Sequence, residues 1–83
     1  MKEITLDCSQ IVNETQLHQA LFTALSLPEW YGHNLDALFD CLTELEEDTH
    51  LILKNWKQTS YSKGFESVFD DAADAGGFHY TLA

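Results

Sequence analysis

Three short segments with the pattern of β-strands are separated by longer stretches with the pattern of helices, and this order limits the fold. Residues 2–7 and 78–82 alternate between apolar and polar side chains, whereas residues 50–54 have a continuous apolar centre. Alternation is typical of a strand with one face in water, and a continuous apolar run is typical of a central strand. The sequence therefore predicts three strands, with residues 50–54 in the middle.

Two helices are expected between the first two strands. Asn13 resembles the N-cap of a capping box, and apolar residues then recur at helical spacing until Pro28, which cannot continue a helix. Gly32 permits a tight turn, after which a second helix is expected to begin at residue 33 or 34. The buried stripe of this second helix consists of Leu35, Leu38, Leu42 and Leu45.

A further helix is expected before the last strand. Residues 55–64 are polar and rich in turn-forming residues, with room for a short helix. A longer helix then ends at the glycine pair of residues 76–77. Its apolar stripe consists of Phe65, Val68, Phe69 and Ala72.

Helices between consecutive strands imply parallel pairing through crossovers, because parallel strands cannot be joined by tight turns. Right-handed crossovers in the order 1-2-3 place all the helices on one face of the sheet. We therefore expect a single α/β domain over residues 1–83, with a three-stranded parallel sheet and helices in a second layer. The chain has no signal-peptide pattern and no apolar run of membrane-spanning length, so a cytoplasmic location is expected.

The charge distribution limits the classes of partner. The chain has four lysines, no arginine and fourteen acidic residues, and no basic residue lies between Lys2 and Lys54. Nucleic acid and anionic membranes are excluded as expected partners, because binding their phosphates requires cations. A basic protein is the natural complement of such a charge, although acidity that serves only solubility is an equal alternative from composition alone.

The second expected helix has an acidic face opposite its leucine stripe. Asp36, Asp40 and Glu44 follow one another at four-residue spacing, with Glu47 one turn further on. Each like-charged pair at this spacing destabilises a helix by about 0.2–0.5 kcal/mol. A solvated helix face is the ordinary interpretation, and a surface kept for a cationic partner is the alternative.

Motifs for catalysis or metal binding are not found in the sequence. The four histidines are scattered without the spacing of a metal site, and no glycine-rich phosphate loop is present. Cys8 and Cys41 form no CxxC motif and are expected to be buried free thiols. We therefore expect neither an enzyme nor a bound cofactor or metal.

Residues 25–43, with the sequence L-S-L-P-E-W-Y-G-H-N-L-D-A-L-F-D-C-L-T, resemble the central segment of the barstar family of ribonuclease inhibitors. Residues 17–19 and the helix of residues 66–76 also resemble the family, although the segment before that helix is shorter. The resemblance thus extends over the full chain. It implies the family's three-stranded parallel sheet in order 1-2-3, which agrees with the order deduced above.

The resemblance implies an inhibitor that binds a basic extracellular-type ribonuclease, or a toxin nuclease, in a one-to-one complex. In this family, the loop and helix of the central segment plug the enzyme's active site, with carboxylates in place of RNA phosphates. Asp40 would be the principal phosphate mimic, and Asp36 would contact a neighbouring basic patch. The expected contact residues are Trp30, Gly32, Asn34, Leu35, Asp36, Phe39, Asp40, Thr43 and Asp71.

Several positions differ from the family pattern and bear on the identity of the target. His33 replaces an acid, Glu44 a glycine and Leu45 a tryptophan, while Trp30, Phe39 and Asp71 replace a tyrosine, a tryptophan and a glutamate. The alternative function is an acidic adaptor or nucleic-acid mimic that binds a basic protein other than a ribonuclease.

Overall fold

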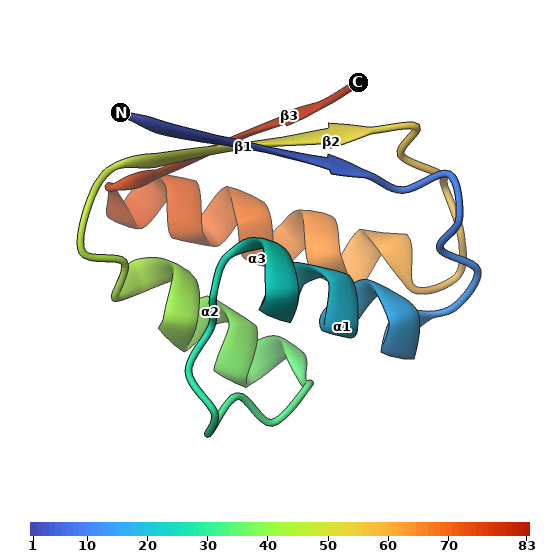
Figure 1. The fold of residues 1–83 in the computed structure, drawn as a ribbon, viewed down its shortest axis with the longest axis horizontal. Coiled ribbons are helices and arrows are strands. Elements are labelled where there is room, and N and C mark those ends of the chain that lie inside the picture. Colours follow the sequence, from blue (N-terminus) through green and yellow to red (C-terminus); the bar gives the residue numbers. More distant parts are fainter.

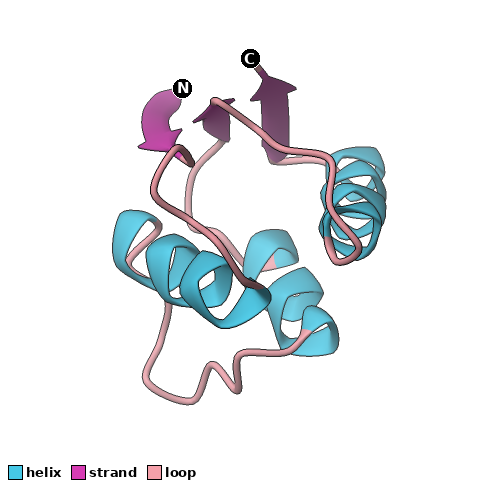
Figure 2. Cartoon of the chain, turned by 90° about the vertical axis from the view of Figure 1, so that its right-hand side faces the viewer, coloured by secondary structure: helices cyan, strands magenta, loops and turns pink.

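The computed structural model describes residues 1–83 and contains three strands and three helices (Figure 1). Their order is β1 (Lys2–Asp7), α1 (Glu14–Ala24), α2 (Leu35–Thr43), β2 (Thr49–Lys54), α3 (Ser62–Ala75) and β3 (Phe78–Leu82). The strands form one parallel sheet in the order β1-β2-β3. All three helices lie on the same side of this sheet (Figure 2), which confirms the expected two-layer α/β fold.

The register of the sheet separates an inner face from an open face. Ile4, Leu51 and Tyr80 are paired across the three strands, and Leu51 in the middle is fully buried beneath the helices. Leu53 is also fully buried, whereas Ile52 between them lies half-buried on the open face. The apolar run of β2 therefore predicted its central position correctly, although only alternate side chains reach the core.

Asparagine side chains begin α1 and α2. Oδ1 of Asn13 accepts a hydrogen bond from the backbone N–H of Gln16, and Oδ1 of Asn34 accepts one from Ala37, both at 2.8 Å. These bonds satisfy N–H groups that the first turn of a helix leaves without a partner. The Gln16 side chain accepts from the N–H of Val12 at 2.9 Å, one residue before the cap, so the expected capping box is a variant of the usual one.

Several local features differ from the sequence-based expectation or add to it. α2 ends at Thr43, with Glu44 as its C-cap, so Leu45 and Glu47 lie beyond the helix on which they were expected. The left-handed backbone of the turn before α2 falls on His33, with φ of 54°, and not on Gly32. A Cβ atom at Gly32 would lie 3.0 Å from the Asn34 side chain, so glycine leaves room for the helix cap. Residues 55–61 contain no separate short helix, and α3 begins one turn before its apolar stripe, at Ser62.

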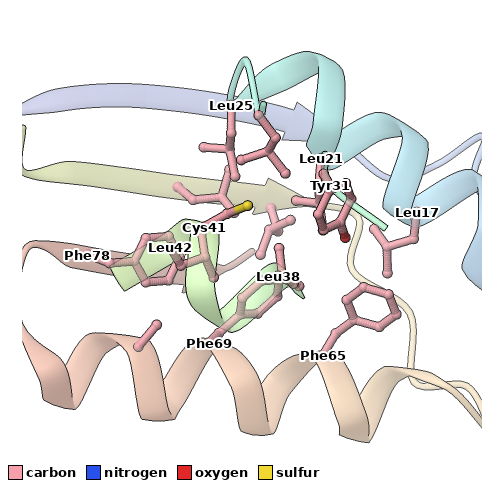
Figure 3. Packing of buried hydrophobic residues seen from close by; sticks show 14 of the residues in the cluster. Leu17, Leu21, Leu25, Tyr31, Leu38, Cys41, Leu42, Phe65, Phe69 and Phe78 are labelled. Carbon is pink, nitrogen blue, oxygen red and sulfur yellow. The ribbon is translucent and has the colours of Figure 1, made fainter. Parts of the chain in front are cut away.

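A cluster of 16 buried hydrophobic residues fills the space between the sheet and the helices. Figure 3 shows Phe65, Phe69 and Phe78 within this core, near Leu38 and Leu42 of α2. α3 packs against both β3 and α2, and α1 packs against β1. The position of α2 therefore depends on α3, since α2 has no extensive contact with a strand.

The core position of Phe69 gives a test of this arrangement. Its ring is fully buried, with ring centroids 5.3 Å from Tyr80 and 6.1 Å from Phe78. Phe69→Ala should lower the free energy of unfolding by about 3–5 kcal/mol, measured by urea titration. Val12→Ala, at a side chain that is 71% exposed, is the control and should change it by less than about 0.5 kcal/mol. Equal effects of the two substitutions would contradict the packing described.

Candidate partner-binding site

An acidic hollow lies where α2 runs beside α3. It has a volume of about 350 Å³ and is lined by Leu35, Asp36, Phe39, Asp40, Val68 and Asp71. Five of these residues were expected as contacts from the sequence. Val68 was assigned only to the apolar stripe of α3, and the structure leaves it half-buried at the wall of the hollow.

Three exposed carboxylates surround this hollow. Asp36 and Asp40 lie one turn apart on α2, and Asp71 faces the same hollow from α3. No lysine lines it, so the negative charge is not neutralised by this chain. Asp36 lies in the first turn of α2, where the helix dipole favours a negative charge, but Asp40 in the middle gains no such stabilisation.

The apolar part of the hollow depends on close packing between the two helices. A Cβ atom at Gly64 of α3 would lie only 2.8 Å from Cδ1 of Leu35, so the glycine gives this leucine its space. Phe39, like Leu35, is half-buried and packs against the core. Half-buried apolar groups among exposed carboxylates form a surface that can exclude water around a charged contact.

The other four expected contact residues lie outside this hollow. Asn34 caps the start of α2, and the Thr43 hydroxyl at its end shares its proton between the carbonyls of Phe39 and Asp40, at 3.0 and 3.1 Å. Gly32 belongs to the exposed loop before α2. Trp30 is 59% exposed and lines a separate hollow of about 410 Å³ beside the acidic residues that follow α2.

Tyr31 anchors the loop that carries Trp30. This loop lies at the bottom of Figure 1, away from the sheet, and Figure 3 shows the Tyr31 ring beside Leu17 and Leu21 of α1. Tyr31 is 3% exposed, and its hydroxyl forms a hydrogen bond with Nδ1 of His18. Burial raises the pKa of the Tyr31 phenol. Burial, followed by the charge on His33, lowers the pKa of the His18 imidazole.

Comparison with known proteins decides the family. The profile described as "Barstar (barnase inhibitor)" matches residues 1–81. The chain belongs to the barstar family. A Bacillus subtilis (strain 168) protein named "Putative ribonuclease inhibitor YrdF" is 41% identical over 75 residues, which cover 89% of this chain and 80% of that protein. The resemblance predicted from residues 25–43 is thus confirmed for almost the whole length of this barstar-family protein.

No cluster of three or more histidine, cysteine or acidic side chains is arranged to hold a metal ion. None of the helices is both long and apolar enough to cross a membrane. Cys8 and Cys41 are buried free thiols, as expected, and burial raises the pKa of both, which disfavours the reactive thiolate.

Acidification should destabilise this barstar-family protein through His18. Because the pKa of His18 is lower in the folded protein than the ordinary value near 6.5, the unfolded chain binds more protons, and stability falls as the pH drops below about 6.5. Urea unfolding between pH 7.5 and 5.5 should therefore show a smaller loss of stability for His18→Gln than for the wild type. Equal slopes of stability against pH for His18→Gln and the wild type would contradict the prediction.

Proposed function

We propose that this protein is a one-to-one inhibitor of a basic ribonuclease. The surface around the hollow between α2 and α3 would cover the enzyme's active site. The supporting observation is that Asp36 and Asp40 of one helix and Asp71 of another surround a single hollow that no lysine lines. Family membership supports the inhibitor role, because the family is described as a barnase inhibitor and the Bacillus subtilis relative is named as a ribonuclease inhibitor. Such an inhibitor performs no catalysis of its own.

The chemistry of the hollow suits the imitation of RNA phosphates. A ribonuclease binds phosphates with cationic side chains, and a carboxylate offers these side chains the same sign of charge and two acceptor oxygens. Arginine can bind a carboxylate through two parallel hydrogen bonds. Asp40 would take the place of the central phosphate, with Asp36 and Asp71 beside it, while Leu35 and Phe39 would exclude water.

The rest of the proposed contact surface follows α2 and its preceding loop. Trp30 is the exposed aromatic side chain of this loop and would act as an anchor on the enzyme. Asn34 and Thr43 hold the two ends of α2 and, with Gly32, would border the contact. Because these residues stand on a helix and a loop tied down by Tyr31, little conformational entropy would be lost on binding.

The negative charge of this protein would also increase the rate at which it meets a basic enzyme. The net charge of -10 creates a field that attracts a basic enzyme over distances comparable with the Debye length. We place this inhibitor in the cytoplasm, where it would protect the cell that produces a secreted ribonuclease or a toxin nuclease. Association should slow as salt is added, because salt screens that attraction.

The proposal is tested by titrating a small, basic, guanyl-specific ribonuclease with this protein while RNA cleavage is followed at low and moderate salt. A linear loss of activity that reaches zero at one equivalent is expected. If cleavage continues unchanged at excess protein, the inhibitor role fails for this enzyme class. The alternative of an acidic adaptor or nucleic-acid mimic for another basic protein would then be favoured.

Asp40→Asn tests the central contact while keeping the shape of the side chain. Removing one partner of a charge pair that becomes buried in a complex weakens binding by about 2–5 kcal/mol, which is about 30-fold or more in the inhibition constant. The barnase–barstar complex is itself one of the systems behind this range. The free energy of unfolding should change by less than about 0.5 kcal/mol, because Asp40 is exposed in the free protein.

The matched control for Asp40→Asn is Glu3→Gln, which removes one negative charge from β1 on the open face of the sheet. Both variants have the same net charge, so the difference between their inhibition constants isolates the local contact. Glu3→Gln should stay within about threefold of the wild type, the range of a screened surface charge. Equal losses for the two variants would place the contact elsewhere.

A further inference from the structure

A second polar hollow lies on the other side of the first turn of α2. It has a volume of about 380 Å³ and is lined by Glu14, Thr15, His18, His33, Asn34, Leu35 and Asp36. Leu35 and Asp36 also line the hollow between α2 and α3, so these two residues form a wall shared by both. A partner that covers the first hollow therefore reaches the edge of the second.

The second hollow contains a buried imidazole with one unused nitrogen. His18 is only 5% exposed, and its Nδ1 atom is hydrogen-bonded to the Tyr31 hydroxyl, but its Nε2 atom has no hydrogen-bond partner. Thr59 Oγ1 is the one side-chain polar atom that is buried without either a partner or access to the surface. Nε2 of His18 is therefore accessible, and the hollow that His18 lines provides that access.

The walls of the hollow present negative charge. Glu14 comes from α1 and Asp36 from α2, and no lysine lines the space between them. His33 is held over the hollow with its Nε2 atom 3.3 Å from Oε1 of Gln19, and its ring centroid is 6.1 Å from that of His18. In the tautomer in which Nδ1 of His18 donates to the Tyr31 hydroxyl, Nε2 is a hydrogen-bond acceptor. An unfilled hollow with two carboxylates and this acceptor suits a cation that carries several N–H donors.

We propose that this hollow, here called the Glu14–Asp36 pocket, binds an arginine side chain of the partner. A guanidinium is planar, offers five N–H donors to carboxylates and stacks on aromatic rings such as the His33 imidazole. The chain contains no arginine, so this side chain must come from another molecule. As a contact with a ribonuclease, the pocket rests on the proposed function, and it would select enzymes with an arginine beside the active site.

Protonation of His18 would oppose this binding. The groups that face His18 are Glu14, Tyr31, His33 and Asp36, and burial lowers the pKa of His18 so that the ring is neutral at pH 7. At lower pH, a positively charged His18 imidazole would share the pocket with a positively charged guanidinium. Arginine binding should therefore weaken as the pH falls from 7.5 to 5.5.

The pocket can be tested without a ribonuclease. Nα-acetyl-arginine-N-methylamide would be titrated into the isotope-labelled protein of 83 residues while the ring C–H signals of its histidines are followed by NMR. Saturable shifts are expected at His18 and His33 and not at His50 and His79, which belong to the sheet. The citrulline derivative, which has the same shape without the charge, is the matched control and should give no saturable shift.

Glu14→Gln should weaken binding of the arginine derivative about threefold or more, the effect of losing one exposed ion pair. Glu3→Gln should not change it, because this residue lies on the other side of the sheet. Equal shifts with the citrulline derivative, or unchanged arginine binding by Glu14→Gln, would overturn the pocket. Tighter binding of the corresponding lysine derivative would overturn its assignment to a guanidinium.

The two proposals fail in different experiments. Absence of arginine binding overturns the Glu14–Asp36 pocket and leaves the ribonuclease titration unaffected. Arginine binding without inhibition of the guanyl-specific ribonuclease overturns the inhibitor role for this enzyme class and supports the pocket as part of a surface for another basic protein. If both tests succeed, Glu14→Gln should raise the inhibition constant less than Asp40→Asn, because Glu14 stands at the edge of the proposed contact.

Discussion

The contact between α2 and α3 is the constraint on which the proposed surface depends. Leu38 and Leu42 bury the inner side of α2 near the aromatic residues of α3, and Gly64 lets Leu35 approach closely. The sheet alone would not position α2, since this helix has no extensive contact with a strand. Carboxylates from two helices meet at one hollow because this apolar contact fixes their separation.

The elements of the fold could be predicted from periodicity because each has a buried side with regular spacing. The sequence also identified Asp36 and Asp40 on the acidic face of α2, since like charges four residues apart are visible along the chain, but it extended this face too far, to Glu47. The second hollow could not be foreseen, because Glu14, His33 and Asp36 come from three separate segments without a shared pattern. The left-handed backbone of His33 in the turn before α2 was also not foreseen, because glycine is the residue that the sequence pattern associates with such a turn.

The acidic face of α2 lowers the stability of the free protein. Neighbouring carboxylates on α2 repel one another, and no lysine of this chain lines either of the hollows at its first turn. The hydrophobic core, the asparagine caps and the Tyr31–His18 hydrogen bond supply compensating stability. Such locally unfavourable charge repulsion is what the proposed contact with a cationic partner would require.

The three-stranded sheet leaves the outer edges of β1 and β3 without a neighbouring strand. Such edges can pair with strands of other molecules and begin aggregation. β3 contains no aspartate, glutamate, lysine or arginine, so its own sequence offers little protection. Protection against such pairing comes instead from the repulsion between whole molecules, each with a net charge of -10. The charge that would draw a basic enzyme towards α2 therefore also keeps copies of this protein apart.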